Sequence, residues 1–261
     1  MVTGASDGIG RAIAVELAKA GISLVLVARR RELLEALAAD LTRKHSIQAR
    51  ILVVDLGQRD AVGAVASATE NLDVGLLAAI AGFGTSGPFI DGALGSELEM
   101  IDVNCRAVVE LSHHFARRFA ARRRGGLVLM SSLLAFQGVP RAAAYAATKA
   151  FIQTFAEGLR LELSSSGVDV VASAPGPVRS GFEARADMRM SAAASPDVVA
   201  RQTLEALGRR TTVRPGLLSK FLETSLLALP RRTRSRIMAV VMEGMTRHQN
   251  DGRKQKAGGF A

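Results

Sequence analysis

Short apolar runs of strand length alternate with longer segments of helical period along most of this chain. The runs are "SLVLVA" from Ser23, "ARILVV" from Ala49, "GLLAAIA" from Gly75, "GLVLMS" from Gly126, "VDVVAS" from Val168 and "TTV" from Thr211. Such alternation is typical of repeated βαβ units, in which helices cover both faces of a parallel sheet. The sequence therefore predicts an α/β protein with a doubly wound parallel sheet.

The segments between these runs predict helices over residues 10–20, 32–44, 97–123, 145–164 and 196–207. Gly21 suits the C-terminal cap of the first helix, and Ser195 with Pro196 suits the start of the last. No repeat or linker divides the chain, so we expect one domain over residues 1–216. Leucine-rich or methionine-rich segments at 217–229 and 232–245 then predict a helical extension over 217–261, with a disordered end at 251–261.

The composition limits the core and the class of protein. The 261 residues are 48% hydrophobic, with no tryptophan and a single tyrosine, so Ala, Val, Leu and Ile must fill most of the core. The single cysteine, Cys105, excludes an intrachain disulfide and agrees with a reducing compartment. No apolar run approaches the roughly 18 residues of a membrane span, and the opening "MVTGAS" is unlike a secretory signal. We therefore expect a cytoplasmic protein.

The net charge of +10 belongs to the C-terminal part of the chain. Lys and Arg exceed Asp and Glu by one in residues 1–200 and by nine in residues 201–261. The main body thus gives no electrostatic reason to bind nucleic acid, and Phe221 and Phe260 are too few aromatics for base stacking by the tail. Leucines beside the arginines of 231–236 leave two alternatives, contact with an anionic membrane surface or partner, and a helix that covers a pocket or the sheet edge.

The segment "TGASDGIG" places Gly4, Gly8 and Gly10 between a strand remnant and the first predicted helix. Glycines at such a turn let the backbone approach a phosphate closely, and a helix N-terminus favours an anion. The spacing G-x-x-x-G-x-G therefore indicates a dinucleotide site, with an ordinary glycine-rich turn as the alternative.

The end of the second predicted strand indicates which dinucleotide binds. Folds of this kind place an acid there to select NAD and a base to select NADP, whose ribose carries a 2′-phosphate. Arg29 and Arg30 follow this strand, so we expect NADP rather than NAD, with Arg29 as the phosphate contact and Ser6 as a helper. The alternative is that these arginines only solvate a helix start. Asp55, which ends the third strand, either accepts from the adenine amino group or caps the next helix.

The single tyrosine, Tyr145, precedes Lys149 by four residues in "YAATKA". On a helix these two side chains share one face. An ammonium about 4 Å from a phenol, at an effective dielectric constant near 20, contributes about 4 kcal/mol, which lowers the pKa of the phenol by roughly three units from its ordinary value near 10. A phenol tuned in this way exchanges a proton with a carbonyl or alcohol oxygen near neutral pH.

Taken in order, these segments resemble the short-chain dehydrogenase/reductase family, in its single-domain branch, over roughly residues 1–216. The matching pieces are "TGASDGIG", "VVDL", "AG" at Ala81 and Gly82, "VNCRA" with Asn104, "SS" with Ser132, "YAATK", and "PGPVRS" from Pro175 to Ser180. Each piece is weak alone, but the ordered set is highly specific. The resemblance implies a Rossmann-like fold and an NADP-dependent enzyme that moves a hydride between its cofactor and a carbonyl or secondary alcohol.

The resemblance also implies roles for single residues. Tyr145 is the acid/base, Lys149 activates it and anchors the nicotinamide ribose, and Ser132 bonds the substrate oxygen. Asn104 supports a proton-relaying water. Taken singly, Ser132 could end a strand and Asn104 could satisfy helix backbone. The cofactor contacts implied besides Tyr145 and Lys149 are Gly4, Ser6, Gly8, Ile9, Gly10, Arg29, Asp55, Ala81, Gly82, Pro175, Gly176, Val178 and Ser180.

The substrate and the assembly are predicted more coarsely. Residues 181–194, rich in Ala, Met and Arg, are expected to form a mobile lid whose apolar side chains favour a hydrophobic or acyl-type carbonyl substrate. The long predicted helices from Glu97 and from Tyr145 resemble those that the family uses for dimer and tetramer contacts, so we expect a homo-oligomer. Neighbouring His113 and His114 diverge by about 100° on a helix and cannot share a metal, so no metal site is expected.

Two departures from the family support a rival hypothesis, a nucleotide-binding scaffold without turnover. Ile80 stands where an asparagine usually precedes "AG", which replaces an amide that braces the central sheet by an apolar group. Only Met1 and Val2 precede Thr3, so either the chain begins late or the first strand is weak at the middle of the sheet.

Overall fold

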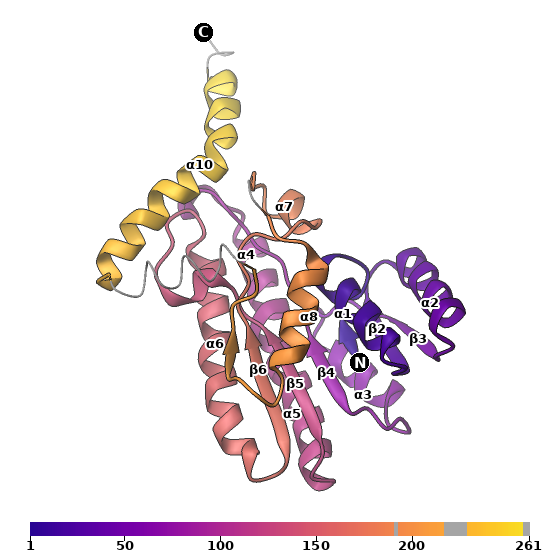
Figure 1. The fold of residues 1–261 in the computed structure, drawn as a ribbon. Helices are drawn as coiled ribbons and strands as arrows, with labels where there is room; N and C mark the ends of the chain where they lie inside the picture. The colour runs from indigo at the N-terminus through magenta and orange to yellow at the C-terminus, as the bar shows by residue number, and fades with distance from the viewer. Residues whose placement is uncertain (191–192, 217–228, 258–261) are drawn as a thin grey trace.

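The computed structural model describes residues 1–190, 193–216 and 229–257. Its core is a seven-stranded sheet in the order β3-β2-β1-β4-β5-β6-β7, and neighbouring strands are parallel (Figure 1). The strands are β1 (Val2–Thr3), β2 (Leu24–Ala28), β3 (Ala49–Val53), β4 (Leu76–Ala79), β5 (Gly125–Met130), β6 (Val168–Ser173) and β7 (Thr212–Val213). The predicted doubly wound parallel sheet is therefore confirmed.

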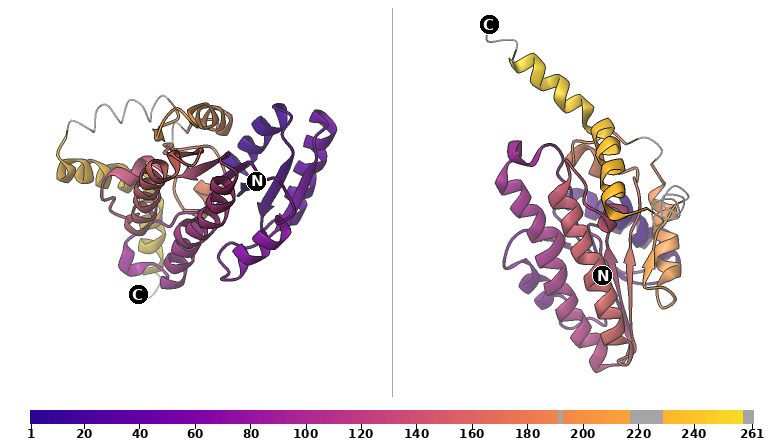
Figure 2. Two further views of the ribbon diagram at one scale, coloured as in Figure 1. Left: turned by 90° about the horizontal axis from the view of Figure 1, so that it is seen from below. Right: turned by 90° about the vertical axis from the view of Figure 1, so that its left-hand side faces the viewer.

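Two layers of helices cover the sheet (Figure 2). One layer consists of α1 (Gly8–Lys19), α2 (Arg31–His45) and α8 (Pro196–Ala206), which share one buried apolar cluster with the sheet. The other consists of α3 (Ala61–Ala68), α5 (Ala107–Ala121) and α6 (Ala143–Ser164). Ala, Val, Leu and Ile dominate both clusters, as the composition predicts, and Phe115 and Phe119 of α5 are the largest fully buried side chains.

Most predicted elements lie within a few residues of their observed positions. The helical stretch predicted over 97–123 spans 94–121, but its regular period is interrupted. The chain forms α4 (Leu94–Ile101), a π-helical turn η2 (Asp102–Arg106) and then α5. A π turn inserts one extra residue, so no regular period of 3.6 residues predicts it. Helix α3 was also missed, because its short run of Ala, Val, Gly and Ser has little polar contrast between its faces.

The first strand is short, yet it occupies the middle of the sheet. Val2 pairs with Leu26 on one side and with Ala78 on the other. The Thr3 hydroxyl accepts hydrogen bonds of 3.0 Å from the backbone N–H groups of both Ile80 and Ala81. Thr3 therefore braces the end of β4, which is the role expected of an asparagine at position 80. Ile80, which stands there instead, packs in the apolar cluster beside α1.

The C-terminal extension is helical, but its bounds differ from the prediction. Helix α10 spans Arg231–Ala257, so residues 251–257, expected to be disordered, continue the helix, and their Lys, Gln and Ala residues suit one. Most of the predicted segment 217–229, and residues 258–261, lie outside the described residues. Helix α10 crosses the carboxyl edge of the sheet and then extends away from the domain (Figure 1). Within the described ranges, no helix has both the length and the apolar character that a membrane span requires.

Helix α2 offers a stability test in which the same substitution is made at two adjacent positions. Leu34 is 0% exposed beneath the helix, whereas Leu33 is 43% exposed. We expect Leu34→Ala to lower the free energy of unfolding by about 2–5 kcal/mol because it leaves a cavity, and Leu33→Ala to lower it by less than about 1 kcal/mol. Urea unfolding of both variants measures the difference, and equal losses would contradict the packing described for α2.

Candidate active site

A cavity of about 1100 Å³ lies at the carboxyl edge of the sheet. It runs from the β1–α1 turn, past the ends of β4 and β5, to α6, the segment after β6, and α10. The strand order reverses between β1 and β4, and in doubly wound sheets ligands bind at this reversal. The fold therefore places the cavity where a dinucleotide is expected.

The glycine-rich turn lines one end of this cavity. Gly4 and Gly8 have φ angles of +65° and +52°, which residues with a Cβ rarely adopt. A Cβ on Gly10 would lie 2.3 Å from the Gly4 carbonyl oxygen, so only glycine lets α1 begin this close to β1. The turn leaves an open groove beside the N-terminus of α1, which fits the diphosphate of a dinucleotide.

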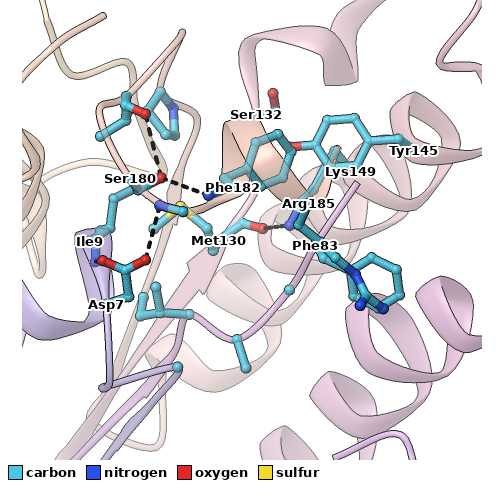
Figure 3. Close-up of a pocket in the computed structure, with 18 of the residues that line it drawn as sticks. Asp7, Ile9, Phe83, Met130, Ser132, Tyr145, Lys149, Ser180, Phe182 and Arg185 are labelled. Carbon is cyan, nitrogen blue, oxygen red and sulfur yellow. Dashed lines mark hydrogen bonds between the residues drawn. The ribbon is translucent and has the colours of Figure 1, made fainter. Parts of the chain in front are cut away.

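Asp7, within this turn, was not singled out by the sequence. Its Oδ1 accepts a 2.7 Å hydrogen bond from the Gly8 N–H and so caps α1. Its Oδ2 accepts a 2.9 Å bond from the Gly181 N–H, from the segment that follows β6 (Figure 3). Asp7 thereby connects the glycine-rich turn to the start of the predicted lid.

The two arginines that follow β2 both line the cavity but have different partners. Arg30 donates to the Ser6 hydroxyl at 2.9 Å from Nη2 and 3.3 Å from Nε. Arg29, the predicted phosphate contact, lies 3.5 Å from Glu99 and 3.8 Å from Asp55. The predicted helper Ser6 is thus the neighbour of Arg30. Asp55 also accepts a 3.1 Å bond from the Gly57 N–H, as a residue that caps the turn after β3 would.

Tyr145, Ser132 and Lys149 meet at the centre of the cavity (Figure 3). Tyr145 lies in the first turn of α6, and its side chain is hydrogen-bonded to that of Ser132, which follows β5. Lys149 lies one turn further along α6, with its Nζ 5.8 Å from the centre of the Tyr145 ring. Lys149 Nζ donates a 2.9 Å bond to the Met130 carbonyl. The three residues predicted at separate positions are therefore brought together.

The expected lowering of the phenol's pKa is wrong for this geometry. Burial raises the pKa of Tyr145 to about 12, against a smaller lowering by the hydrogen bond from Ser132. Burial also lowers the pKa of Lys149 to about 8. The i,i+4 spacing correctly placed the amine near the phenol, but it could not show that removal from water would outweigh the ammonium's attraction.

Asn104 lies in the π-helical turn η2 and is 1% exposed. Its side-chain Oδ1 accepts a 3.1 Å bond from the Phe83 N–H, and its Nδ2 donates to the Phe83 carbonyl at 2.9 Å and to the Thr148 hydroxyl at 3.1 Å. A Cβ on Gly82 would lie 2.7 Å from Oδ1, so glycine is needed there. Asn104 thus fastens the segment after β4 to α6, and it does not line the cavity.

The segment after β6 closes the cavity near Tyr145. Pro175, Gly176, Val178 and Ser180, the cofactor contacts predicted in this segment, line it together with Ile9, Ala81 and Gly82 from the other side. The Ser180 hydroxyl accepts a 3.3 Å bond from the Phe182 N–H. Phe182 begins the short helix α7 (Phe182–Arg185), and its ring lies 5.4 Å from the ring of Tyr145.

Gly84 is the second residue that the sequence did not indicate. A Cβ there would lie 2.7 Å from the Phe182 ring and 3.2 Å from the Tyr145 ring, so glycine leaves the room in which the two rings meet. No local pattern relates positions 84, 145 and 182. Only the tertiary structure brings them together.

Mostly apolar side chains line the part of the cavity beyond Tyr145. Helix α10 contributes to this wall, which agrees with the alternative in which the extension covers a pocket. Its described apolar lining residues are Phe83, Leu133, Leu134, Phe182, Met188, Met190, Ile237, Met238, Val241, Met242 and Met245.

Polar contacts fasten α10 to the loop that follows α7. His248 Nε2 lies 2.9 Å from Asp187 Oδ1. Gln249 Nε2 donates 2.8 Å bonds to the Asp187 carbonyl and to the Ser86 hydroxyl. Ser86 in turn donates a 2.7 Å bond to the Ala186 carbonyl. Residues far apart in sequence therefore hold the outer wall of the cavity together.

Several known proteins are similar to this chain in sequence. A family model described as short chain dehydrogenase matches residues 1–190. A 7beta-hydroxysteroid dehydrogenase of Clostridium sardiniense is 33% identical over 224 residues, which cover 84% of this chain and 86% of that protein. A very-long-chain 3-oxoacyl-CoA reductase of Anas platyrhynchos is 33% identical over 180 residues, which cover 67% of this chain and 58% of that protein.

A solved structure is similar over most of this chain. The short-chain dehydrogenase from Sphingobium yanoikuyae in complex with NADPH is 29% identical, has a TM-score of 0.78, and matches 88% of this chain and 95% of that one. The family match covers well over half of the chain and includes Ser132, Tyr145 and Lys149. This chain therefore belongs to the short-chain dehydrogenase/reductase family and is an NAD(P)-dependent oxidoreductase that acts on CH–OH or C=O groups.

Proposed function

We propose that this protein transfers a hydride between NADP(H) and a carbonyl or secondary alcohol on a bulky, hydrophobic or acyl-type substrate. The observation that carries the proposal is one continuous cavity, with the glycine-rich turn at one end, Tyr145 and Ser132 at its centre, and an apolar wall beyond them. The names of the relatives, a hydroxysteroid dehydrogenase and a 3-oxoacyl-CoA reductase, describe substrates with large apolar bodies.

The cofactor, when bound, supplies or accepts the hydride, and the chain's own residues manage the proton. The hydroxyls of Ser132 and Tyr145, hydrogen-bonded to each other in this structure, would both turn to donate to the substrate oxygen when it enters. A phenol with a pKa of about 12 is protonated at neutral pH, so it is ready to act as the acid in carbonyl reduction. Lys149 would reach the nicotinamide ribose and steady the phenolate that remains.

The preference for NADP rests on Arg29 and Arg30. Two guanidinium groups at the end of β2 provide a charge-assisted site for a 2′-phosphate, and Ser6 is positioned to share it with Arg30. We still expect Arg29 to contact the 2′-phosphate, and we now expect Arg30 to contact it as well. In this proposal the 2′-phosphate takes the place of Glu99 as the partner of Arg29.

The rival hypothesis, a nucleotide-binding scaffold without turnover, relied on Ile80 and on the short first strand. The Thr3 hydroxyl satisfies the backbone N–H groups of Ile80 and Ala81, and β1 pairs on both sides. These contacts remove the two structural reasons for expecting an inactive site.

Tyr145→Phe tests the proposed proton transfer. We expect kcat for reduction of a fused-ring ketone to fall by about 10²–10⁴-fold because the general acid is removed, while NADPH binds with nearly unchanged affinity. Steady-state kinetics and NADPH fluorescence titration measure the two quantities. A variant that keeps its turnover would exclude Tyr145 as the acid, and a wild-type protein inactive on every ketone and aldehyde tested would favour the scaffold.

The ionisation of the single tyrosine can be read directly from phenolate absorbance, because the chain has no tryptophan and no second tyrosine. The phenol should ionise near pH 10 in urea and only near pH 12 in the folded protein. Because the folded pKa is the higher one, the stability that goes with the buried phenol is present below pH 10 and is lost as the pH rises towards 12. Equal titration curves in the two states would contradict its burial.

The role proposed for Lys149 predicts a change on nucleotide binding. Adding NADP⁺ should lower the pKa of Tyr145 in the wild-type protein but not in Lys149→Met, because only the wild type brings an ammonium to the phenol. The same absorbance titration serves here, with nucleotide absorbance subtracted. An equal shift in both proteins would assign the effect to the nucleotide alone.

Cofactor choice is tested at three consecutive arginines. We expect Arg29→Ala and Arg30→Ala each to weaken NADPH binding about tenfold or more and to change NADH binding little, since each removes a charge-assisted phosphate contact. Arg31→Ala is the matched control, because Arg31 lies 3.5 Å from Glu35 on the exposed face of α2. Dissociation constants for NADPH and NADH decide the matter, and a wild-type protein that binds both equally would contradict an NADP preference.

A further inference from the structure

We propose that Arg189 binds an anionic group at the far end of the substrate, so that the substrate combines an apolar body with a terminal carboxylate or similar oxyanion. This inference rests on the proposed function, because it extends the same cavity outward from Tyr145. It narrows the substrate class from bulky hydrophobic ketones and alcohols to amphipathic, negatively charged ones.

The charges that line the cavity differ between its two ends. Asp7 and Asp55 line the cofactor end, together with Arg29 and Arg30. Among the described residues of the segment after β6 and of α10, the charged side chains that line the cavity are Arg185 and Arg189, and no carboxylate of these two segments lines it. An uncompensated positive charge beside an apolar wall favours a ligand with an anionic end.

These two arginines are not equivalent, and Arg185 lies towards the cofactor end, because it contacts the same carboxylate, Glu99, as Arg29 does. Arg185 is already engaged, because its Nη2 lies 3.3 Å from Glu99 and its guanidinium lies over the Phe83 ring, 4.6 Å from the centroid (Figure 3). The guanidinium of Arg189 makes no ion pair or hydrogen bond with any side chain or backbone group of the described residues. Arg189 is therefore the cation that remains available to a ligand.

The backbone holds Arg189 in place. Its N–H donates a 2.9 Å hydrogen bond to the Met245 carbonyl of α10, and the next N–H, that of Met190, donates a 2.6 Å bond to Glu183 Oε1. The residues on either side, Met188 and Met190, line the cavity. The side chain thus starts from a fixed point where the wall formed by α7 meets that formed by α10.

A guanidinium suits this task because its planar fork binds a carboxylate through two parallel N–H···O bonds, which fixes orientation as well as position. An anchor at one end of a long substrate determines which of its carbon atoms lies beside Tyr145 and Ser132. Arg189 is exposed, so salt weakens the attraction and we expect an effect of about tenfold rather than several thousandfold.

The test uses one fused-ring ketone in two forms, the free carboxylate and its methyl ester. Three proteins are compared: the wild type, Arg189→Gln, and Arg210→Gln as the matched control. Arg210 is an exposed arginine outside the cavity lining, so its substitution removes the same net charge from the chain. For each pair we measure KM and kcat with NADPH, and the dissociation constant of each ketone by calorimetry on the full chain.

We expect the wild type and Arg210→Gln to prefer the carboxylate by about tenfold in KM and in dissociation constant, and Arg189→Gln to lose that preference. Higher salt should reduce the preference in the first two proteins only. A preference that persists in Arg189→Gln, or a wild type that binds both forms equally, overturns the assignment. The binding measurement decides this even if neither ketone is turned over, and that lack of turnover would count against the proposed function separately.

Discussion

The close approach of α1 to the end of β1 is the constraint on which the rest of the site depends. Only a glycine at position 10 lets the helix begin there, because a Cβ would lie 2.3 Å from the Gly4 carbonyl oxygen. This contact places the helix N-terminus at the reversal of strand order, with Thr3 bracing the end of β4 beside it. Strand β1 is only Val2–Thr3, so this small set of contacts aligns the two halves of the sheet. The glycine-rich turn on one half and α6 on the other consequently line the same cavity.

Burial then determines how the central groups titrate. Removal from water favours the neutral form of both an acid and a base, so it raises the pKa of Tyr145 to about 12 and lowers that of Lys149 to about 8. At neutral pH the lysine is still mostly charged and the phenol is fully protonated. In this geometry Tyr145 is therefore ready to donate a proton. For Tyr145 to accept one it must first be a phenolate, which requires the Lys149 ammonium to move closer or another positive group to bind nearby.

The fold was predictable from the sequence because its signals are local. Buried parallel strands read as apolar runs, a glycine-rich turn precedes the first predicted helix, and Tyr145 and Lys149 share one face of a helix. What could not be predicted depends on contacts between distant segments. The π turn that carries Asn104, the pairing of Ser6 with Arg30 rather than Arg29, and the effect of burial on the phenol leave no mark in any periodicity.

The outer wall of the cavity also depends on contacts between distant segments. Gly84, Phe182 and the methionines of α10 lie far apart in sequence, yet together they surround the space in front of Tyr145. Hydrogen bonds tie that wall to the cofactor end through Asp7 and Gly181, and to α10 through Met245. Most of these residues lie outside the strands and α6, which position the proton-transfer groups, so the wall can vary in shape and charge on the same framework wherever it does not contact Tyr145. We therefore expect substrate choice to depend on the segment after β6 and on α10, whereas the strands and α6 position the groups that transfer the proton.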